Sequence, residues 1–432
     1  MLRKNNFLKA LFVCLFITTL LFVSCPEAEK TNNQNNQNNP NNNVDPNNPV
    51  NPGNGSSFEK NSLDYFNDNN IRAGINIGNT LDASSETGWG NPKVNQALLN
   101  GIKESGFNIV RIPVTWTTHI GKAPDYKIDE KWLERVVEIA GYANNAGIKA
   151  VIINVHHDGS SGGGWLSLNK ALDKTNPTQK TEINEKFTKL WEQIATRFKD
   201  HGEWLIFEAF NEIHDGNWFW AGRPNLPPTD PKYISDEQYA LVNEWAQVFT
   251  DTVRATGGNN AKRYLVIPSY CTGPEALLTD KFVLPTDSAA GKQIVSFHYY
   301  RPDEFSLNGK SKTWESTANK NDIIFNFMNL NVKFTEKNIQ VIIGETGPVL
   351  SIIAEGADRA TADANRISYI NFFFKEAKDN SIVPIYWDNG KFTRTADKNG
   401  NGDSFGIYNR NTGKPYDDNM AAVIKAMVGA VK

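Results

Sequence analysis

The chain has 432 residues, a formal net charge of −3 and 11 tryptophans. This length fits one large α/β barrel or two average domains. The near-neutral charge argues against a nucleic-acid-binding protein, which needs a clustered basic surface. Tryptophan is plentiful, and its flat ring suits both core packing and stacking on the apolar face of a sugar. The composition therefore favours a large α/β domain and excludes nucleic acid as a partner.

The N-terminus carries an export signal and a lipidation motif. A basic segment precedes an apolar run, residues 10–23, which is too short for a comfortable membrane span. The run ends in Leu-Phe-Val-Ser-Cys, which resembles a bacterial lipobox with Cys25 as the lipidated residue. We therefore expect residues 1–24 to be a lipoprotein signal peptide. Ordinary signal-peptidase cleavage near Ser24 is the alternative, and both interpretations export the protein.

Residues 25–57 are predicted to form a lipidated N-terminus and a disordered linker. Residues 31–57 are almost entirely Asn, Gln, Pro and Gly, and such a segment cannot bury apolar area. We expect a tether that joins a lipid-anchored Cys25 to one catalytic domain, residues 58–432. The protein would then touch a bacterial membrane only through its lipid, with the domain outside the cytoplasm. Cys271 is left as a buried small hydrophobe, so no intrachain disulfide is expected.

From residue 58 onward, short β-branched runs alternate with helical stretches, as in βα units around a parallel sheet. The predicted strands are Ala73–Gly78, Ile109–Val114, Ala150–His156, Trp204–Asn211, Tyr264–Pro268, Ile294–Tyr300, Gln340–Glu345 and Val383–Trp387. The predicted helices are Val94–Glu104, Glu130–Asn145, Ile183–Phe198, Glu237–Ala255, Ile323–Phe334, Asp358–Ala377 and Met420–Val431, and the fifth crossover is the weakest, around Pro274 to Asp280. Together they predict a (β/α)8 barrel with extended loops.

Polar residues gather at the C-terminal ends of these strands, where such a barrel places its catalytic groups. They are Arg111, His156, His157, Asn211, Glu212, His298, Tyr300, Glu345, Trp387 and Asp388. A carboxylate at the end of a buried strand is costly, because desolvation disfavours its charged form. Glu212 and Glu345 are two such carboxylates, and a pair of this kind suits glycoside cleavage by an acid and a nucleophile.

The two-residue period of a strand predicts which side chains face the barrel mouth. Val341, Ile343 and Glu345 share one face, so we expect that face, and Glu345 with it, to point inward. Asn211 and Glu212 are adjacent and cannot both point inward on a regular strand. If both act, a bulge or a sharp loop start is needed there.

The same two-residue period predicts which side chains face inward at the ends of the other strands. His298 and Tyr300 share a face, which selects Tyr300 over its neighbour. His156 is expected on the inward face of the third strand, and His157 on the opposite face unless the strand has already turned.

Eight short motifs in order give the chain a family resemblance. The motifs are Asn76–Asp82, Glu86–Pro92, Val110–Trp116, Ile153–Asp158, Phe210–Glu212, His298–Tyr300, Gly344–Gly347 and Trp387–Gly390. With them the chain resembles glycoside hydrolase family 5, the retaining cellulase family of the 4/7 barrel clan, and most of all its subgroup of endoglucanases, lichenases and xyloglucanases. Two departures are Ile213, where Pro commonly follows the acid, and Thr346, where an aromatic residue is often seen.

The resemblance implies that Glu212 is the acid/base and Glu345 the nucleophile. Retention requires two carboxyl groups about 5–5.5 Å apart with different protonation states. Arg111 and the Tyr300 hydroxyl are the natural groups to favour the charge of Glu345, whereas Glu212 must begin protonated. His298 is placed to tune or relay the proton of Glu212.

The resemblance also implies substrate-binding or supporting roles around the pair. Asn211 would bind a sugar 2-hydroxyl, and Trp387 would form the floor of the sugar site where the bond breaks. The remaining supporting residues are Asn79, Trp89, His156 and His157. Core packing is the alternative for Trp89 and for the two histidines. An open cleft several sugars long is expected from four loop tryptophans, Trp165, Trp218, Trp220 and Trp314.

No cofactor and no metal are expected. The pair His156–His157 suggests a metal, but barrel metallohydrolases need a further histidine pair on the first strand, which is absent from Gly74 to Asn79. Residues 397–403 resemble a calcium loop, but the glycine is one position early and Tyr408 stands where a bidentate Glu is required. We read that segment as a surface turn.

These features predict an exported, lipid-anchored, retaining endo-β-1,4-glucanase that acts on β-glucan polysaccharides as a monomer. A hydrolase specific for xyloglucan, mixed-linkage glucan or mannan is the alternative within the class. A non-catalytic surface glycan-binding protein is more remote, because binding alone needs no pair such as Glu212 and Glu345. The sequence does not rank the glucans, since loop shape decides that preference.

Overall fold

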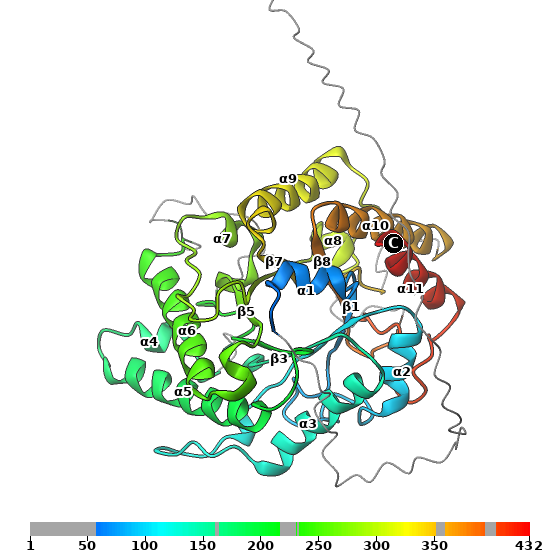
Figure 1. The fold of residues 1–432 in the computed structure, drawn as a ribbon. Helices are drawn as coiled ribbons and strands as arrows, with labels where there is room; N and C mark the ends of the chain where they lie inside the picture. The colour runs from blue at the N-terminus through cyan, green and yellow to red at the C-terminus, as the bar shows by residue number, and fades with distance from the viewer. Residues whose placement is uncertain (1–57, 160–163, 217–229, 231–232, 351–358, 394–402) are drawn as a thin grey trace, which may run out of the picture. The chain divides into compact units, whose positions relative to one another are not determined.

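The computed structural model describes residues 58–159, 164–216, 230, 233–350, 359–393 and 403–432. Parallel strands pair in sequence order and close into a barrel, with helices around it (Figure 1). The strands are β1 (Gly74–Ile77), β2 (Ile109–Ile112), β3 (Ala150–Asn154), β4 (Leu205–Glu208), β5 (Leu265–Pro268), β6 (Gln293–Tyr299), β7 (Gln340–Thr346) and β8 (Ile382–Asp388). The predicted barrel is confirmed, and the predicted leader and linker lie outside the described residues.

The helices that cover the barrel agree with the predicted ones to within a few residues at most ends, and α5 and α9 begin five or six residues early. They are α2 (Gln96–Glu104), α3 (Glu130–Asn145), α5 (Thr178–Phe198), α6 (Asp236–Ala255), α7 (Pro274–Leu278), α9 (Thr317–Lys333), α10 (Arg359–Asp379) and α11 (Asp418–Ala430), with shorter helices α1 (Ser62–Asp68), α4 (Leu168–Ala171) and α8 (Asp303–Ser306). Side-chain caps fix several starts. Ser235, for example, forms a capping box with Gln238 at the start of α6. Helix α7 is the short fifth crossover.

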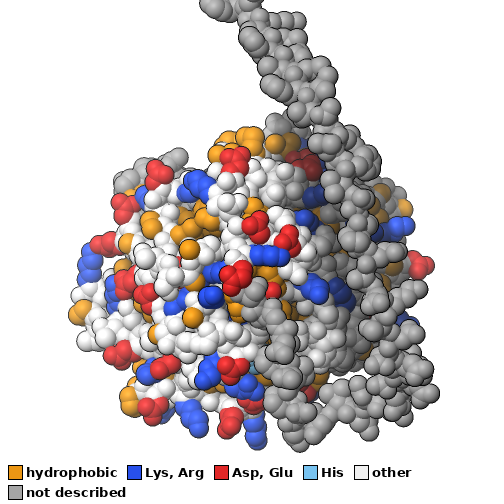
Figure 2. All heavy atoms as spheres, viewed as in Figure 1, with side chains coloured by type: hydrophobic (Ala, Val, Ile, Leu, Met, Phe, Trp, Pro, Cys, Tyr) orange, Lys and Arg blue, Asp and Glu red, His pale blue; other side chains and the backbone are white. Residues whose placement is uncertain are grey.

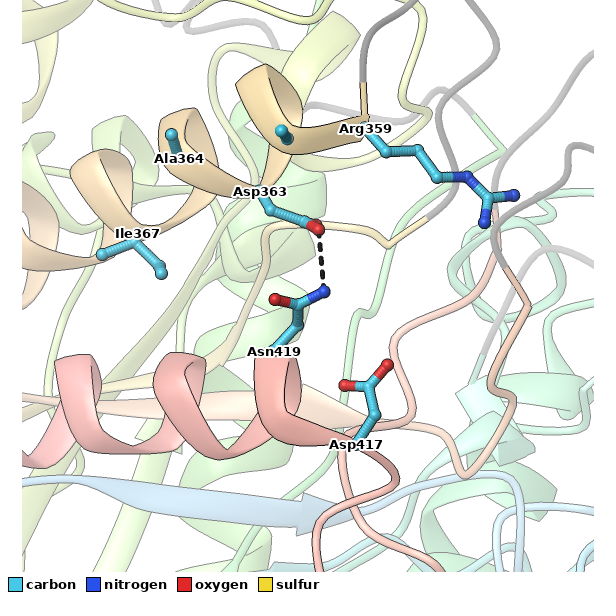
Figure 3. Close-up of a pocket in the computed structure, with 7 residues that line it drawn as sticks. Arg359, Asp363, Ala364, Ile367, Asp417 and Asn419 are labelled. Carbon is cyan, nitrogen blue, oxygen red and sulfur yellow. Dashed lines mark hydrogen bonds between the residues drawn. The ribbon is translucent and has the colours of Figure 1, made fainter.

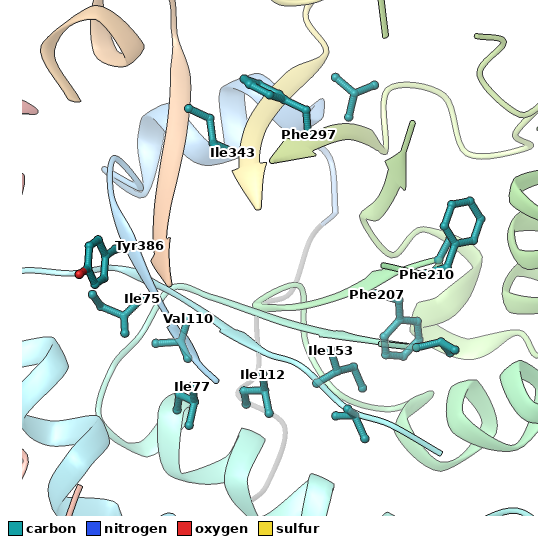
Figure 4. Close-up of a cluster of buried hydrophobic side chains, with 14 of the residues drawn as sticks. Ile75, Ile77, Val110, Ile112, Ile153, Phe207, Phe210, Phe297, Ile343 and Tyr386 are labelled. Atoms are coloured by element: carbon teal, nitrogen blue, oxygen red, sulfur yellow. The ribbon is translucent and has the colours of Figure 1, made fainter. Parts of the chain in front are cut away.

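The strands have two buried faces. The outer face packs against the helices, and Figure 4 shows part of this layer, including Val110, Ile153, Phe207, Phe297 and Ile343. The inner face forms a separate cluster that α1 plugs from the N-terminal side of the barrel. Its members are Phe58, Tyr65, Phe66, Ile71, Ile109, Ala150, Ile152, Ile206, Tyr264, Val266, Ile294, Ile342, Val383 and Ile385. Polar inner-face residues therefore collect above this plug, towards the C-terminal ends of the strands.

The surface agrees with the near-neutral charge. Figure 2 shows acidic and basic side chains interspersed on the face in view, rather than gathered into one basic area. Across the described ranges, no helix combines the length and apolar character needed to cross a bilayer. Cys271 is buried in the barrel domain, as predicted.

Candidate active site

A β-bulge brings Glu345 into the barrel mouth. Phe297 pairs with Ile343, but the next residue, His298, pairs with Glu345, so Gly344 is the extra residue of the bulge. Ile343 packs in the outer layer with the helices, whereas Ile342 lies in the inner cluster. The prediction that the face of Val341 and Ile343 points inward is therefore wrong. Glu345 faces the mouth because the bulge shifts the alternation by one residue.

Glycine is required at the bulge because two polar groups crowd position 344. A Cβ there would lie 2.8 Å from Ser296 Oγ and 2.9 Å from His298 Nε2. Both groups come from the inner face of β6, and both are buried without a hydrogen-bond partner among the described residues. Gly344 thus allows β6 and β7 to approach closely beneath the carboxylate.

Glu345 is held by charged and hydroxyl donors. Arg111 NH1 donates to Oε1 at 2.9 Å, and the Tyr300 hydroxyl donates to Oε2 at 3.1 Å. Nε2 of His156 lies 3.9 Å from Oε1. Burial raises the pKa of Tyr300 well above its ordinary value, so the phenol remains a donor. As predicted from the shared face, His298 and Tyr300 both reach the carboxylates.

Glu212 stands in the loop after β4. The predicted fourth strand was too long at this end, because β4 ends at Glu208 rather than at Asn211. The backbone has left the regular strand before Asn211 and Glu212, so both adjacent side chains reach the same site. His298 Nδ1 lies 2.6 Å from Glu212 Oε1, and 11% of the Glu212 side chain is exposed.

The two carboxylates are close together but have different surroundings. One oxygen of Glu212 and one of Glu345 lie within 4.8 Å of each other. Burial raises the pKa of Glu212 well above its ordinary value, and the charge of Glu345 raises it further. Burial also raises the pKa of Glu345, to about 7, but Arg111 and Tyr300 oppose this shift by stabilising the charged form. The proton of the pair therefore resides on Glu212, and Glu345 ionises first.

Arg111 donates hydrogen bonds to four side chains of the site. It is fully buried and uses all three of its nitrogens: Nε donates to Glu208 at 2.7 Å, and NH2 donates to Asn211 Oδ1 at 2.7 Å. NH1 bonds Asn76 Oδ1 at 3.0 Å in addition to Glu345. Because Asn211 turns its oxygen to Arg111, its amide N–H groups are left to meet a substrate hydroxyl.

Sequence reasoning missed Glu208 and Asn76 as members of the site. Both lie on the inner faces of their strands, and Ile206, two residues before Glu208, belongs to the inner cluster. A charged residue on the inward face of β4 was the available signal. Glu212, four residues later, carries the stronger motif signal.

Hydrogen bonds fix the tautomer of His156. Asn154 Oδ1 accepts from the backbone N–H of Val114 at 3.1 Å, so its amide nitrogen is the group 3.3 Å from His156 Nδ1. Nδ1 is therefore the acceptor and Nε2 carries the proton. Burial lowers the pKa of His156 well below its ordinary value, so the ring is neutral. It presents one N–H donor towards Glu345.

This tautomer disfavours a metal at the neighbouring cluster. Asp82, His156 and His157 place possible ligand atoms within 4.8 Å of one another. A metal on His156 Nε2 would require the proton on Nδ1, where the Asn154 amide already donates. The residues present do not fit a metal ion. The other such group, Glu212, His298 and Glu345, is the hydrogen-bonded centre itself.

Two aromatic rings border the centre. The Trp387 ring lies parallel to the His156 ring, with a centroid distance of 5.9 Å and an interplanar angle of 4°. Gly78 backs this indole, since a Cβ at that position would lie 2.8 Å from its ring atoms. Trp89 is 51% exposed and its centroid lies 5.6 Å from that of His157. Trp387 thus offers a flat apolar surface beside His156, and Trp89 offers an exposed one beside His157.

Other predicted site residues lie apart from the centre. Asn79 occupies a left-handed turn after β1, where its backbone N–H binds Asp82, and within the described chain no hydrogen bond joins its side chain to the carboxylates. The expectation that Trp314 flanks the cleft is wrong, because this residue is 1% exposed and packs against Tyr369 in the core. Trp165 is half-buried and its indole N–H binds Asp158 at 2.9 Å.

The rest of the predicted cleft and the calcium-like turn are not covered by the described ranges. Trp218, Trp220 and residues 397–402 lie outside them. A pocket of different character lies between the first turns of α10 and α11 (Figure 3). Its lining combines four polar residues, Arg359, Asp363, Asp417 and Asn419, with small or aliphatic ones, and lacks an aromatic ring. It does not include the carboxylate pair.

Comparisons with known proteins agree with this arrangement. The family model described as "Cellulase (glycosyl hydrolase family 5)" matches residues 64–393. Endoglucanase B of Clostridium cellulovorans is 36% identical over 345 residues, covering 79% of this chain and 70% of that protein. The xyloglucan-specific endo-beta-1,4-glucanase BoGH5A of Bacteroides ovatus is 32% identical over 381 residues, covering 83% of this chain and 69% of that protein. A solved Bacteroidetes-affiliated GH5 cellulase, linked with a polysaccharide utilization locus, has a TM-score of 0.76 at 33% identity, covering 86% of this chain and 94% of the other.

Proposed function

Because this chain belongs to the cellulase family of glycosyl hydrolases, family 5, we propose that it is an endo-β-1,4-glucanase that cleaves β-glucan with retention of configuration. The observation that carries the proposal is the pairing of Glu212 and Glu345, whose nearest oxygens lie within 4.8 Å. Inverting enzymes hold their carboxyl groups about 6.5–9.5 Å apart to leave room for a water molecule. A closer pair suits direct attack by one carboxylate.

In the first step, Glu345 is the nucleophile and Glu212 the acid. An oxygen of Glu345 forms a bond to the anomeric carbon while the bond from that carbon to the leaving sugar oxygen breaks. Glu212 gives its proton to that oxygen. Arg111 and Tyr300 keep Glu345 ionised before the attack, and the buried surroundings of Glu212 keep it protonated.

In the second step, the ionised Glu212 acts as a base. It takes a proton from a water molecule whose oxygen attacks the anomeric carbon, and the bond to Glu345 breaks. The sugar leaves with its original configuration and both carboxyl groups return to their starting states. His298, hydrogen-bonded to Glu212, positions that carboxyl group through both steps.

Substrate contacts follow from the remaining groups of the site. The Asn211 amide is placed to bind a sugar hydroxyl beside the nucleophile, an interaction that strengthens in the transition state. Trp387 provides a flat floor for the sugar whose bond breaks, and Trp89 provides an exposed ring farther along. His156 and His157 border the same floor.

Four polymers are candidates for the preferred substrate. Cellulose-type β-1,4-glucan is the first candidate, and one relative named above is xyloglucan-specific, which favours xyloglucan as the second. Mixed-linkage glucan and mannan complete the set. Initial rates on purified polymers of each type, at equal mass concentration, decide among them. No activity on any of the four would contradict the proposal.

We also propose that the protein is exported and anchored by lipid on Cys25. The support is the basic and apolar leader, the near-lipobox at residues 21–25 and the Asn- and Pro-rich segment that follows. Two or three acyl chains on one cysteine give stable anchoring, whereas a single chain gives only marginal binding. The catalytic domain would then act on polysaccharide outside the cytoplasm.

A non-catalytic glycan-binding role is the rival from another class. It predicts binding of polysaccharide without release of reducing ends. A reducing-sugar assay of the wild-type protein and of Glu345→Gln separates the two. The proposed enzyme releases reducing ends only as wild type, whereas a binding protein releases none in either form and retains the polymer in both.

A further inference from the structure

A third carboxylate lies beneath the catalytic pair. Glu208 is fully buried at the end of β4, and its Oε2 accepts from Arg111 Nε at 2.7 Å and from Asn154 Nδ2 at 2.9 Å. Its Oε1 is buried without a hydrogen-bond partner among the described residues. A buried carboxylate in contact with a guanidinium is costly to remove, because it would leave the arginine charge uncompensated. The proposed function assigns no role to Glu208.

The first consequence is geometric. The guanidinium group is planar and presents its donors in a fixed fork, so the direction of Nε determines the directions of NH1 and NH2. Glu208 holds Nε, and the same plane then directs NH1 to Glu345 at 2.9 Å and NH2 to Asn211 at 2.7 Å. The orientation of both substrate-facing groups thus depends on the contact between Arg111 and Glu208.

The second consequence is electrostatic. The titratable groups that face this centre are Arg111 from β2, His156 from β3, His298 and Tyr300 from β6 and its end, Glu345 from β7 and Glu212 from the loop after β4. Burial, with Arg111 nearby, lowers the pKa values of both histidines well below the ordinary value, and these rings are neutral. Arg111 is therefore the cation that faces the described carboxylates, and Glu208 takes up part of its charge.

We propose that Glu208 is a positioning residue that aims Arg111 at Glu345 and Asn211 and offsets enough of its charge for Glu212 to keep its proton. This inference rests on the proposed function. The charge of Glu208 raises the pKa of Glu212 and of Glu345, after the larger effect of burial in each case. Without Glu208, the full charge of Arg111 would act on the pair, and both carboxyl groups would ionise at lower pH.

The test is the pH profile of kcat/KM for Glu208→Gln. The amide keeps the shape of the side chain and can still accept from Arg111, but the charge is gone. We expect kcat to fall about 10- to 100-fold with KM changed by less than about twofold. We expect both limbs of the profile to move to lower pH, because Glu345 stays ionised and Glu212 loses its proton at lower pH than in the wild type.

A matched control is Asp287→Asn. Asp287 forms a buried ion pair with Arg254, with two contacts of 2.8 Å, but does not belong to the site. This variant also loses a buried charge, so it reports any general effect of a broken ion pair. Its pH limbs should remain at the wild-type positions. A shift equal to that of Glu208→Gln would overturn the inference.

A second variant keeps the test decisive if Glu208→Gln does not fold. Glu208→Asp retains the charge but is too short to hold Nε in place, so kcat should fall while the pH limbs stay near those of the wild type. Folded variants with wild-type kcat and unmoved limbs would overturn the inference, and so would unmoved limbs in Glu208→Gln alone. An inactive wild-type protein would instead contradict the proposed function.

Discussion

Nδ1 of His298 lies 2.6 Å from Oε1 of Glu212, which makes this the shortest contact of either carboxylate with a neighbouring ring. Burial, and then the charge of Arg111, lower the pKa of His298 well below its ordinary value, so the ring is neutral. A neutral imidazole nitrogen can accept a hydrogen bond from a carboxylic acid or, in the other tautomer, donate one to a carboxylate. The same contact therefore serves Glu212 in both of its protonation states.

The acid/base role of Glu212 predicts a split between substrates. Glu212→Ala should lower the rate on polysaccharide by at least about 10³-fold, while aryl glycosides with good leaving groups lose far less in their first step, since they depart without a proton. Added azide should restore turnover by attacking the glycosyl-enzyme without a base. Steady-state rates on both substrate types, with and without azide, check this. Equal losses with no azide effect would count against Glu212.

The hydroxyl of Tyr300 predicts a shift in pH dependence. It donates to Glu345 at 3.1 Å and favours the charged form of that carboxylate, whose pKa burial raises to about 7. Its loss in Tyr300→Phe should raise that pKa further, so the acidic limb of kcat/KM moves to higher pH. The alkaline limb, which reports loss of the proton from Glu212, should move less. An acidic limb that stays in place, measured across a full pH series, would exclude this role.

The bulge glycine predicts a steric effect on activity. In Gly344→Ala the new methyl group would meet Ser296 Oγ at 2.8 Å and His298 Nε2 at 2.9 Å, so β7 or His298 must move. We expect kcat to fall by at least about tenfold, because displacement of the carboxylates by 1 Å costs up to about 10²-fold. Gly141→Ala is the control, since its Cβ would meet nothing within 4 Å in the middle of α3. The control should keep full activity and gain up to about 1 kcal/mol of stability. Equal activity in both variants would refute the steric argument.

The barrel was predictable because the hydrophobic pattern of its strands differs clearly from that of its helices. Runs such as Val151–Ile153 and amphipathic stretches such as that of α3 alternate along the chain, and eight strands leave few other closed arrangements. Strand ends were less predictable. The fourth strand stops at Glu208, three residues short of the predicted Asn211, and the Glu208 carboxylate itself meets the charge of Arg111.

The site was predictable in its residue types and less so in its geometry. A bulge at Gly344 reverses the inside–outside order at the end of β7, and no local pattern signals it, because the crowding comes from Ser296 and His298 on another strand. Trp314 was misjudged for a similar reason. Its loop position suggested exposure, but long-range packing against Tyr369 buries it.

The proposed lipid anchor predicts that mutation of Cys25 moves the protein from the membrane fraction to the soluble fraction. If this cysteine carries lipid, the wild-type protein should sediment with membranes and be released by detergent, whereas Cys25→Ser should appear in the soluble extracytoplasmic fraction. Mass spectrometry of the mature N-terminus should show an acylated cysteine. A soluble wild-type protein whose sequence begins after Cys25 would contradict the proposal. Cys271→Ser is the control, since that thiol is buried in the barrel domain and its loss should leave the fraction unchanged.

The central claim is that Glu345 forms a covalent bond with the sugar. Glu345→Gln should lower hydrolysis by at least about 10⁴-fold while leaving the fold intact. Glu244→Gln, on the outer helix α6, is a control of the same chemistry and should keep full activity. Loss of activity in this control, or a Glu345→Gln variant that still turns over polymer, would argue against a specific role for Glu345.

The most direct measurement is covalent trapping. An activated 2-deoxy-2-fluoro cello-oligosaccharide should inactivate the wild-type enzyme by forming a stable glycosyl-enzyme, because the fluorine slows both steps and the good leaving group speeds up only the first. Peptide mass spectrometry should then place one sugar adduct on Glu345, and Glu345→Gln should remain unlabelled. An adduct on another residue, or inactivation of Glu345→Gln at the wild-type rate, would contradict the account.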